Sequence, residues 1–245
     1  MASPIPDQKA FLKKYDRVET FADYDDFRAK VYPKLKGRPL NLLFASGNYR
    51  LSRLTQELTS SVWSHCALVL YVEAIDRYMV LETVEYFGTR LVPLASYALN
   101  CNDSGKPYDG FVGVAETNFP ALNFIELGRF GTDQLIRSYD YKALVGTGVL
   151  EIAAAITRER EELGLVGRVA DITDEFMRRH WETFLESASE NRQQPSYVCS
   201  NLVADCLKNG GYTVIPRNRV ATGGLVSPDD VWLDEHVSDD LIRIV

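Results

Sequence analysis

Cysteine and histidine are scarce in this sequence, which has 245 residues but only four cysteines and three histidines. The cysteines are Cys66, Cys101, Cys199 and Cys206. No two of them have the C-x-x-C spacing of zinc sites, so we expect no metal and no cofactor. A chain of this length can bury a sizeable core and needs no disulfide framework. We therefore expect reduced thiols, most of which serve only in packing.

The sequence also lacks long apolar runs and an excess of positive charge. Its longest apolar-leaning stretch, residues 143–156, is interrupted by Glu151 and is shorter than the ~20 residues that span a bilayer. Residues 1–14 have no apolar centre of the kind that a secretory signal requires, so we expect a cytoplasmic protein with no transmembrane segment. The net charge of -7 argues against binding to nucleic acid. The oligomeric state stays open.

What the sequence does contain is a strand-rich first half and a helix-rich second half. Phe27, Val31 and Leu35 recur every four residues, and residues 1–39 are predicted to form an N-terminal helical extension. Strands are predicted at residues 40–45, 64–72, 77–86, 90–95 and 111–116, and helices at 52–59, 123–138, 141–156, 173–189 and 200–208. Strands grouped before helices favour an α+β fold, with a small, mainly antiparallel sheet packed against helices. We assign residues 40–245 to one catalytic domain, with a helical insertion around residues 150–190.

Cys199 lies at the entrance to a predicted helix, whose apolar face holds Leu202, Val203, Cys206 and Leu207. The first turn of a helix presents unpaired N–H groups and a partial positive charge, which favour a thiolate and can stabilise an oxyanion. Cys206 belongs to the apolar face and is predicted to be inert core. A packing role for Cys199 is the alternative, and this segment alone favours it.

Among the histidines, His65 has the most suggestive position. His180 lies beside two arginines and His236 follows two acidic residues, so both are predicted to be solvated. His65 opens the apolar run at residues 66–72, at the start of a predicted buried strand. A histidine there is often a hydrogen-bonded structural residue, and the alternative is a base for Cys199.

A catalytic histidine needs a partner that orients its second ring nitrogen. If Val72 pairs with Ile75 across a two-residue loop, Glu82 lies opposite His65. A longer loop brings Glu85 nearer instead. Spacing favours Glu82 only slightly, so the choice stays open at this stage.

These segments resemble a known family. The stretches at residues 41–47, 51–54 and 63–69, the pair Leu81-Glu82 and the helix entrance at residues 197–203 resemble the YiiX/YaeF-like family of permuted papain-fold cysteine amidases, within the NlpC-type peptidase superfamily. The resemblance covers residues 40–212, and in this family the histidine precedes the cysteine, as it does here. Two departures are Pro39-Leu40-Asn41 in place of a Gly-Asp turn, and Ala67 in place of glycine.

The resemblance implies a circularly permuted papain-like fold and a triad of Cys199, His65 and Glu82. The implied activity is a cysteine hydrolase that cleaves an amide, thioester or ester bond through a thioester acyl-enzyme. The substrate is expected to be a small molecule, or a peptide- or lipid-linked acyl group. Tyr197 is a candidate for substrate binding, with simple packing weighed equally. The alternatives are a lipid acyltransferase or phospholipase of lecithin retinol acyltransferase type, and a catalytically inactive binding module.

The remaining cysteines are predicted to be unreactive for different reasons. Cys66 follows His65 on a strand, so its side chain is expected on the opposite face. Cys101 precedes an Asn-Asp-Ser-Gly loop and is expected to be exposed, without a base.

Overall fold

The computed structural model describes residues 8–15, 20–35, 40–59, 61–137, 198–216 and 226–245. Within these residues, no helix is long and apolar enough to cross a membrane. The predicted helices at 141–156 and 173–189, and the predicted insertion around 150–190, lie outside the described residues.

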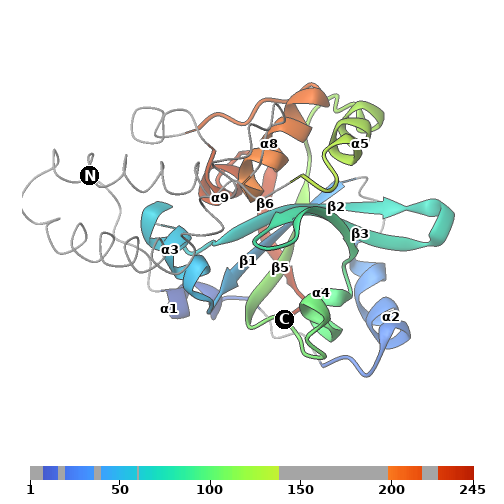
Figure 1. The fold of residues 1–245 in the computed structure, drawn as a ribbon, viewed down its shortest axis with the longest axis vertical. Helices are drawn as coiled ribbons and strands as arrows, with labels where there is room; N and C mark the ends of the chain where they lie inside the picture. The colour runs from blue at the N-terminus through green and yellow to red at the C-terminus, as the bar shows by residue number, and fades with distance from the viewer. Residues whose placement is uncertain (1–7, 16–19, 36–39, 60, 138–197, 217–225) are drawn as a thin grey trace, which may run out of the picture.

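The centre of the fold is a six-stranded sheet in the order β4-β3-β2-β1-β5-β6 (Figure 1). Every neighbouring pair in it is antiparallel. The strands are β1 Leu40–Gly47, β2 His65–Val72, β3 Arg77–Val84, β4 Gly88–Pro93, β5 Gly110–Thr117 and β6 Val237–Arg243. The predicted α+β class with an antiparallel sheet is confirmed. Strand β6 was not predicted, because its exposed Asp239 and Asp240 interrupt the apolar alternation at the edge of the sheet.

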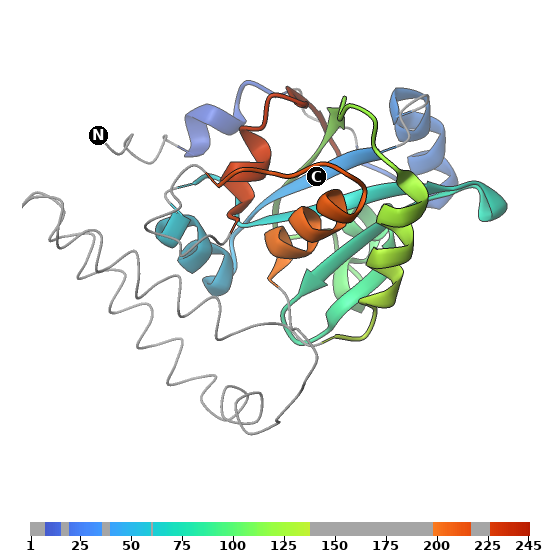
Figure 2. The ribbon, with the colours of Figure 1, turned by 90° about the horizontal axis from the view of Figure 1, so that it is seen from above.

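Helices cover both faces of the sheet (Figures 1 and 2). Helices α2 (Tyr24–Leu35) and α4 (Ser96–Leu99) pack on one face, and α5 (Phe124–Asp133), α8 (Cys199–Asn209) and α9 (Pro228–Trp232) pack on the other. The shorter elements are α1 (Gln8–Leu12), α3 (Arg50–Thr59) and the two 3₁₀ turns η1 (Glu73–Ile75) and η2 (Cys101–Asp103). Because side chains alternate along a strand, Leu42 and Phe44 of β1 enter one core, and Leu43 and Ala45 enter the other. All of β1 is buried as a result.

An aromatic cluster fixes the start of β2. Trp63 is fully buried, with its ring centroid 5.1 Å from that of Trp232, 5.5 Å from Phe44 and 5.7 Å from Phe11 of α1. Rings at these separations, mostly edge to face, pack favourably in a core. The cluster therefore anchors the chain two residues before His65. Helices α1 and α2 both pack on the sheet, and the predicted domain boundary at residue 39 stays a prediction.

The hairpin between β2 and β3 has the longer of the two loops considered. Val72 pairs with Arg77 and not with Ile75, so the two-residue loop, which spacing favoured only slightly, does not form. The turn η1 and Asp76, which has a left-handed φ of 49°, fill the longer connection. Asp tolerates this conformation better than most residues because its short side chain can form local hydrogen bonds. The sequence offered no glycine or proline to mark such a turn.

Candidate active site

Cys199 is the first residue of α8 and follows Val198, which has extended backbone angles. The buried face of α8, with Leu202, Val203 and Cys206, packs over the sheet against β2 and β3. The first turn is held from outside by Ser200, whose hydroxyl donates to the Val226 carbonyl at 2.6 Å. This packing places the Cys199 thiol over the N-terminal end of β2, where His65 lies.

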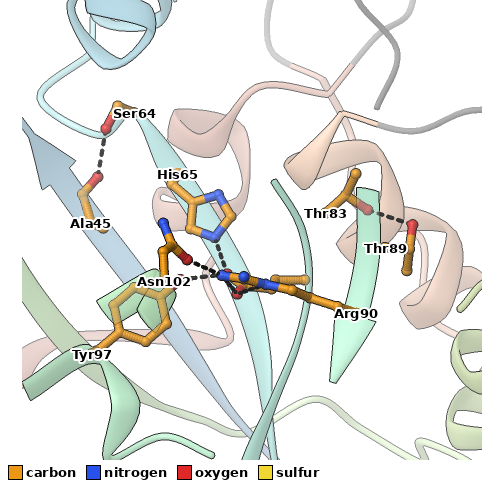
Figure 3. Close-up of polar contacts among 9 residues, drawn as sticks. Ala45, Ser64, His65, Thr83, Thr89, Arg90, Tyr97 and Asn102 are labelled. Atoms are coloured by element: carbon orange, nitrogen blue, oxygen red, sulfur yellow. Dashed lines mark hydrogen bonds and ion pairs between the residues drawn. The ribbon is translucent and has the colours of Figure 1, made fainter. Parts of the chain in front are cut away.

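His65 is the first residue of β2, and only 12% of its side chain is exposed. The residue before it, Ser64, donates to the carbonyl of Ala45 at 3.2 Å and accepts from the backbone N–H of Gly47 at 3.1 Å. These bonds tie the start of β2 to the end of β1 (Figure 3). A hydrogen bond of 2.9 Å joins His65 Nε2 to Glu82 Oε2. This bond leaves Nδ1 for the hydrogen bond between His65 and Cys199.

Glu82 reaches His65 diagonally across the hairpin. Leu68 pairs with Leu81, so extending the register places Val84 opposite His65 and Glu82 two residues further along the same face. Such diagonal neighbours are within reach of a long side chain. The alternative partner, Glu85, lies one residue beyond the end of β3 and lines the nearby cavity, and burial raises its pKa. The structure thus brings Glu82 to the imidazole although the hairpin has the longer loop, for which Glu85 was expected to lie nearer.

Glu82 is fully buried and has donors at both carboxylate oxygens. Arg90 Nε donates to Oε1 at 2.9 Å, and Arg90 Nη2 forms an ion pair with the same oxygen at 2.8 Å. Oε2 accepts from the Tyr97 hydroxyl as well as from His65. Neither Arg90 nor Tyr97 was singled out in the sequence, where each is an unremarkable residue of a strand or loop.

The protonation states follow from these contacts. A hydrogen bond from Cys66 lowers the pKa of Cys199 well below its usual value, and the hydrogen bond and charge of His65 lower it further, against the opposing effect of burial. Burial alone would lower the pKa of His65, but Cys199 and Glu82 raise it to about 10. Burial alone would raise the pKa of Glu82, but His65 and Arg90 hold it below its usual value. The favoured state is a thiolate, an imidazolium and a carboxylate in contact.

The other three thiols are in surroundings that disfavour the thiolate. Cys66 packs in the core with α8, and burial raises its pKa well above the usual value. Its contact with Cys199 was not predicted, because it depends on where α8 docks. The expected exposure of Cys101 is wrong, since the residue is buried and its N–H donates to the Lys106 carbonyl at 2.7 Å. Burial raises the pKa of Cys101 to about 11 and that of Cys206 to about 12.

A cavity of about 290 Å³ opens beside Cys199 and His65. Most of the surface of its wall is apolar, from aromatic and aliphatic side chains, and Ser and Thr hydroxyls and a few other polar groups complete it. The wall consists of Tyr49, Leu51, Ser52, Thr55, Ser64, Thr83, Val84, Glu85, Tyr86, Phe87, Arg90, Tyr97, Cys101, Asn102 and Tyr108. Tyr197, predicted to bind substrate, lies outside the described residues. In the described part of the chain, no group of three or more His, Cys, Asp or Glu residues could hold a metal ion.

We expect Cys66→Ala to make the Cys199 thiol less acidic. The variant removes the hydrogen bond that contributes most to lowering the pKa of Cys199, so the pH at which alkylation reaches half its maximal rate rises. Iodoacetamide labelling across a pH series, followed by peptide mass spectrometry, measures this midpoint. Cys206→Ala is the matched control, because Cys206 is a buried thiol of the same helix with no part in this contact. Equal midpoints in wild type and Cys66→Ala would contradict the prediction.

Comparison with known proteins gives a similarity to a solved structure. No family model matches the chain, and no curated protein sequence matches it. A solved structure described as the metalloprotein yiiX from Escherichia coli O157:H7, DUF1105, is 14% identical, over 84% of this chain and 96% of that chain, with a TM-score of 0.47. That structure bears the name of the family that the sequence resembles, and the similarity of this chain to it is at the level of the family only.

Proposed function

We propose that the protein is a cysteine hydrolase with Cys199 as nucleophile, His65 as acid and base, and Glu82 as the residue that orients His65. The observation that carries the proposal is the contact chain from Cys199 through His65 to Glu82, at the mouth of a cavity. The sequence resemblance named the same three residues. A hydrogen-bonded nucleophile and base, with the base oriented by a third group, is the arrangement that covalent acyl transfer requires.

In the proposed reaction, the Cys199 thiolate attacks the acyl carbon of a bound substrate. The carbonyl electrons move to oxygen, and the N–H groups of the first turn of α8 can stabilise this oxyanion. The tetrahedral intermediate collapses, the bond to the leaving group breaks, and the His65 imidazolium gives the leaving group its proton. Cys199 then carries the acyl group as a thioester. Water attacks the thioester while neutral His65 takes its proton, which releases a carboxylic acid and the free thiol.

The cavity favours substrates with an uncharged, apolar acyl group. Its aromatic wall can enclose a group of modest size, and its one arginine, Arg90, is already engaged by Glu82. An amide, ester or thioester of a peptide or lipid fits this description. The same acyl-enzyme could pass its acyl group to an alcohol or amine, which would make the protein an acyltransferase. A binding module without activity would not need a buried network of charged groups, whose desolvation costs free energy.

The solved neighbour is described as a metalloprotein. The described residues of this chain contain no group of three or more ligands for a metal ion, and those of the proposed site have other partners. The described residues therefore do not fit a metal, and no step of the proposed reaction is routed through one.

Acyl trapping tests the proposal directly. We expect p-nitrophenyl butyrate to acylate Cys199, visible as a mass increase of the intact protein that hydroxylamine removes and that peptide mapping locates. Cys199→Ala should abolish the adduct, whereas Cys101→Ala, which removes another thiol of the cavity wall, should retain it. Decay of the adduct in plain buffer with release of butyrate marks a hydrolase, and decay only after addition of an alcohol or amine marks a transferase. An adduct on Cys101, or one that survives in Cys199→Ala, would refute the proposal.

A further inference from the structure

The carboxylate of Glu82 faces two sets of donors, one at each oxygen. His65 and Tyr97 occupy Oε2, and the guanidinium of Arg90 occupies Oε1 with two N–H groups. Because Arg90 takes the oxygen that His65 does not use, it fixes the rotation of the carboxylate about its last bond. Figure 3 shows His65, Arg90, Tyr97 and Asn102 gathered around this network of contacts.

Arg90 is itself held from several sides. It lies directly opposite Glu82 in the β3–β4 pairing, and the next cross-strand pair, Thr83 and Thr89, shares a hydrogen bond of 2.8 Å between hydroxyls. Arg90 Nη2 also donates to Asn102 Oδ1 at 2.6 Å, and the guanidinium lies 4.7 Å from the centroid of the Phe87 ring. A guanidinium constrained by a carboxylate, an amide and a ring has little rotational freedom left.

The turn η2 presents Asn102 to Arg90 in an uncommon backbone conformation. Asn102 has a φ of 54°, in the left-handed region, and Asp103 after it has a φ of 59°. The side chain of Asn100 braces the turn: its Nδ2 donates to Asp103 at 3.2 Å, and its Oδ1 accepts from the Gly105 N–H at 2.6 Å. Asn and Asp tolerate such backbone better than most residues, and it persists where surrounding contacts impose it, often at functional sites.

Arg90 also balances the charge of the site. In the favoured state Cys199 and Glu82 are negative, and His65 and Arg90 are positive, so the four buried or nearly buried charges sum to zero. Without Arg90 the set would carry a net negative charge in surroundings that solvate charge poorly, and protonation of Glu82 would relieve it.

We infer that Arg90, held by Asn102, is a positioning residue that keeps Glu82 ionised and aimed at His65. The inference rests on the proposed function, because it assigns Arg90 a part in activating Cys199. The groups that face Glu82 from the surrounding elements are His65 on β2, Arg90 on β4, Tyr97 on α4 and Cys101 on η2. Cys199 on α8 contacts the other side of this network through His65, and Tyr108 and Glu85 lie in the same cavity wall. Arg90 is the one among them whose positive charge does not depend on pH near neutrality.

The inference predicts the direction of a pH shift. Loss of Arg90 lets Glu82 take up a proton at higher pH, and it also removes a positive charge that favours the Cys199 thiolate. The acid limb is the part of the pH profile in which the alkylation rate of Cys199 falls as the pH decreases. Both effects move this acid limb to higher pH. We expect Arg90→Met to shift this limb upward by about one unit, which is a tenfold loss of rate below the limb.

The experiment measures alkylation of Cys199 by iodoacetamide across a pH series in the full chain, with circular dichroism as a check of folding. Arg90→Lys should recover part of the shift, since it restores the charge without the two-pronged contact. Asn102→Gly keeps the left-handed backbone and Arg90 itself, and should give a smaller shift in the same direction. Arg129→Met, which breaks an exposed pair with Glu126, is the matched control and should resemble wild type.

Turnover of p-nitrophenyl butyrate supplies the second readout, with a lower kcat and little change in KM expected for Arg90→Met. An acid limb in Arg90→Met and Asn102→Gly that matches wild type would overturn the inference. If Arg90→Met fails to fold, Asn102→Gly alone decides it. A wild-type protein whose Cys199 behaves as an ordinary thiol would instead refute the proposed function, so the two failures are distinguishable.

Discussion

Replacing His65 by alanine should slow the alkylation of Cys199 at low pH, whereas at high pH the variant should react as fast as the wild type or faster. In the wild type the pair of Cys199 thiolate and His65 imidazolium persists from the lowered pKa of Cys199 up to the pKa of His65, about 10. Without the imidazole, the pKa of Cys199 rises toward the ordinary ~8.5 of a cysteine. At about pH 5 the variant should therefore react roughly ten- to a hundredfold more slowly, after allowance for the greater nucleophilicity of a more basic thiolate. Above about pH 9 that greater nucleophilicity should make the variant as fast as the wild type or faster.

Competitive labelling at limiting iodoacetamide, read by peptide mass spectrometry, measures this effect for every thiol at once. Cys199 should label before Cys66, Cys101 and Cys206 in the wild type, because burial raises the pKa of each of those three. His236→Ala is the control, since His236 packs against Tyr212, with ring centroids 5.2 Å apart, and not at the cavity. Equal rates for wild type and His65→Ala at about pH 5 would show that His65 and Cys199 do not act as a pair.

The second large effect concerns stability. Glu82→Leu leaves the guanidinium of Arg90 without its carboxylate partner, and breaking a buried ion pair in this way costs about 3–5 kcal/mol of unfolding free energy. We expect the lower end of that range, because 20% of the Arg90 side chain is exposed and can reach water. The double variant Glu82→Leu/Arg90→Met removes the unpaired guanidinium and should recover part of this loss, but not all of it, because His65 and Tyr97 still lack the carboxylate. Urea unfolding followed by tryptophan fluorescence measures all three proteins.

Activity separates the two variants from the wild type in a different way. Both lack the carboxylate that orients His65, so both should show the slow, ordinary reactivity of Cys199 at low pH, although the double variant is the more stable of the two. If the double variant is as unstable as Glu82→Leu, the loss comes from packing around residue 82 or from the unpaired His65 and Tyr97, and not from the unpaired guanidinium. If the double variant keeps wild-type reactivity, Glu82 does not orient His65.

The same pair gives a pH dependence of stability. The pKa of Glu82 is lowered in the folded protein, so its contribution to stability is present above its unfolded value of about 4.3 and is lost as the pH falls below it. The double variant lacks this contribution. Its stability should therefore fall less than that of the wild type between neutral pH and about pH 3.

The central strands and the residues of the candidate site could be predicted because local patterns in the sequence indicate them. The alternation and β-branched content of residues 64–72 and 77–86 predicted two neighbouring strands, and His65 and Cys199 were recognisable from the elements that they begin. Glu82 was only one of two candidates. Its selection depends on a diagonal contact across a longer turn than expected, which the linear pattern of apolar residues does not specify.

The parts that were missed depend on tertiary contacts. Cys101 was expected to be exposed because its neighbours are polar, yet the turn folds the thiol into the cavity wall. The donor role of Cys66 requires α8 to dock on β2, and the role of Arg90 requires the register of β3 with β4. The turn between β3 and β4 has one signal in the sequence. Tyr86 and Gly88 have left-handed φ values of 66° and 67°, but only the glycine can be recognised from the sequence as a residue that favours this conformation.

The site draws its members from distant parts of the chain, and this bears on when the thiol becomes reactive during folding. His65 and Glu82 belong to one hairpin with a short connection, which can form early because little chain entropy opposes it. Cys199 reaches them only when α8, from the other side of a long intervening segment, packs on the finished sheet. Until that step the chain carries four ordinary cysteines, mostly protonated near neutral pH. We therefore expect the reactive thiolate to appear at the end of folding, so that a chain still emerging or partly folded is spared premature acylation and oxidation.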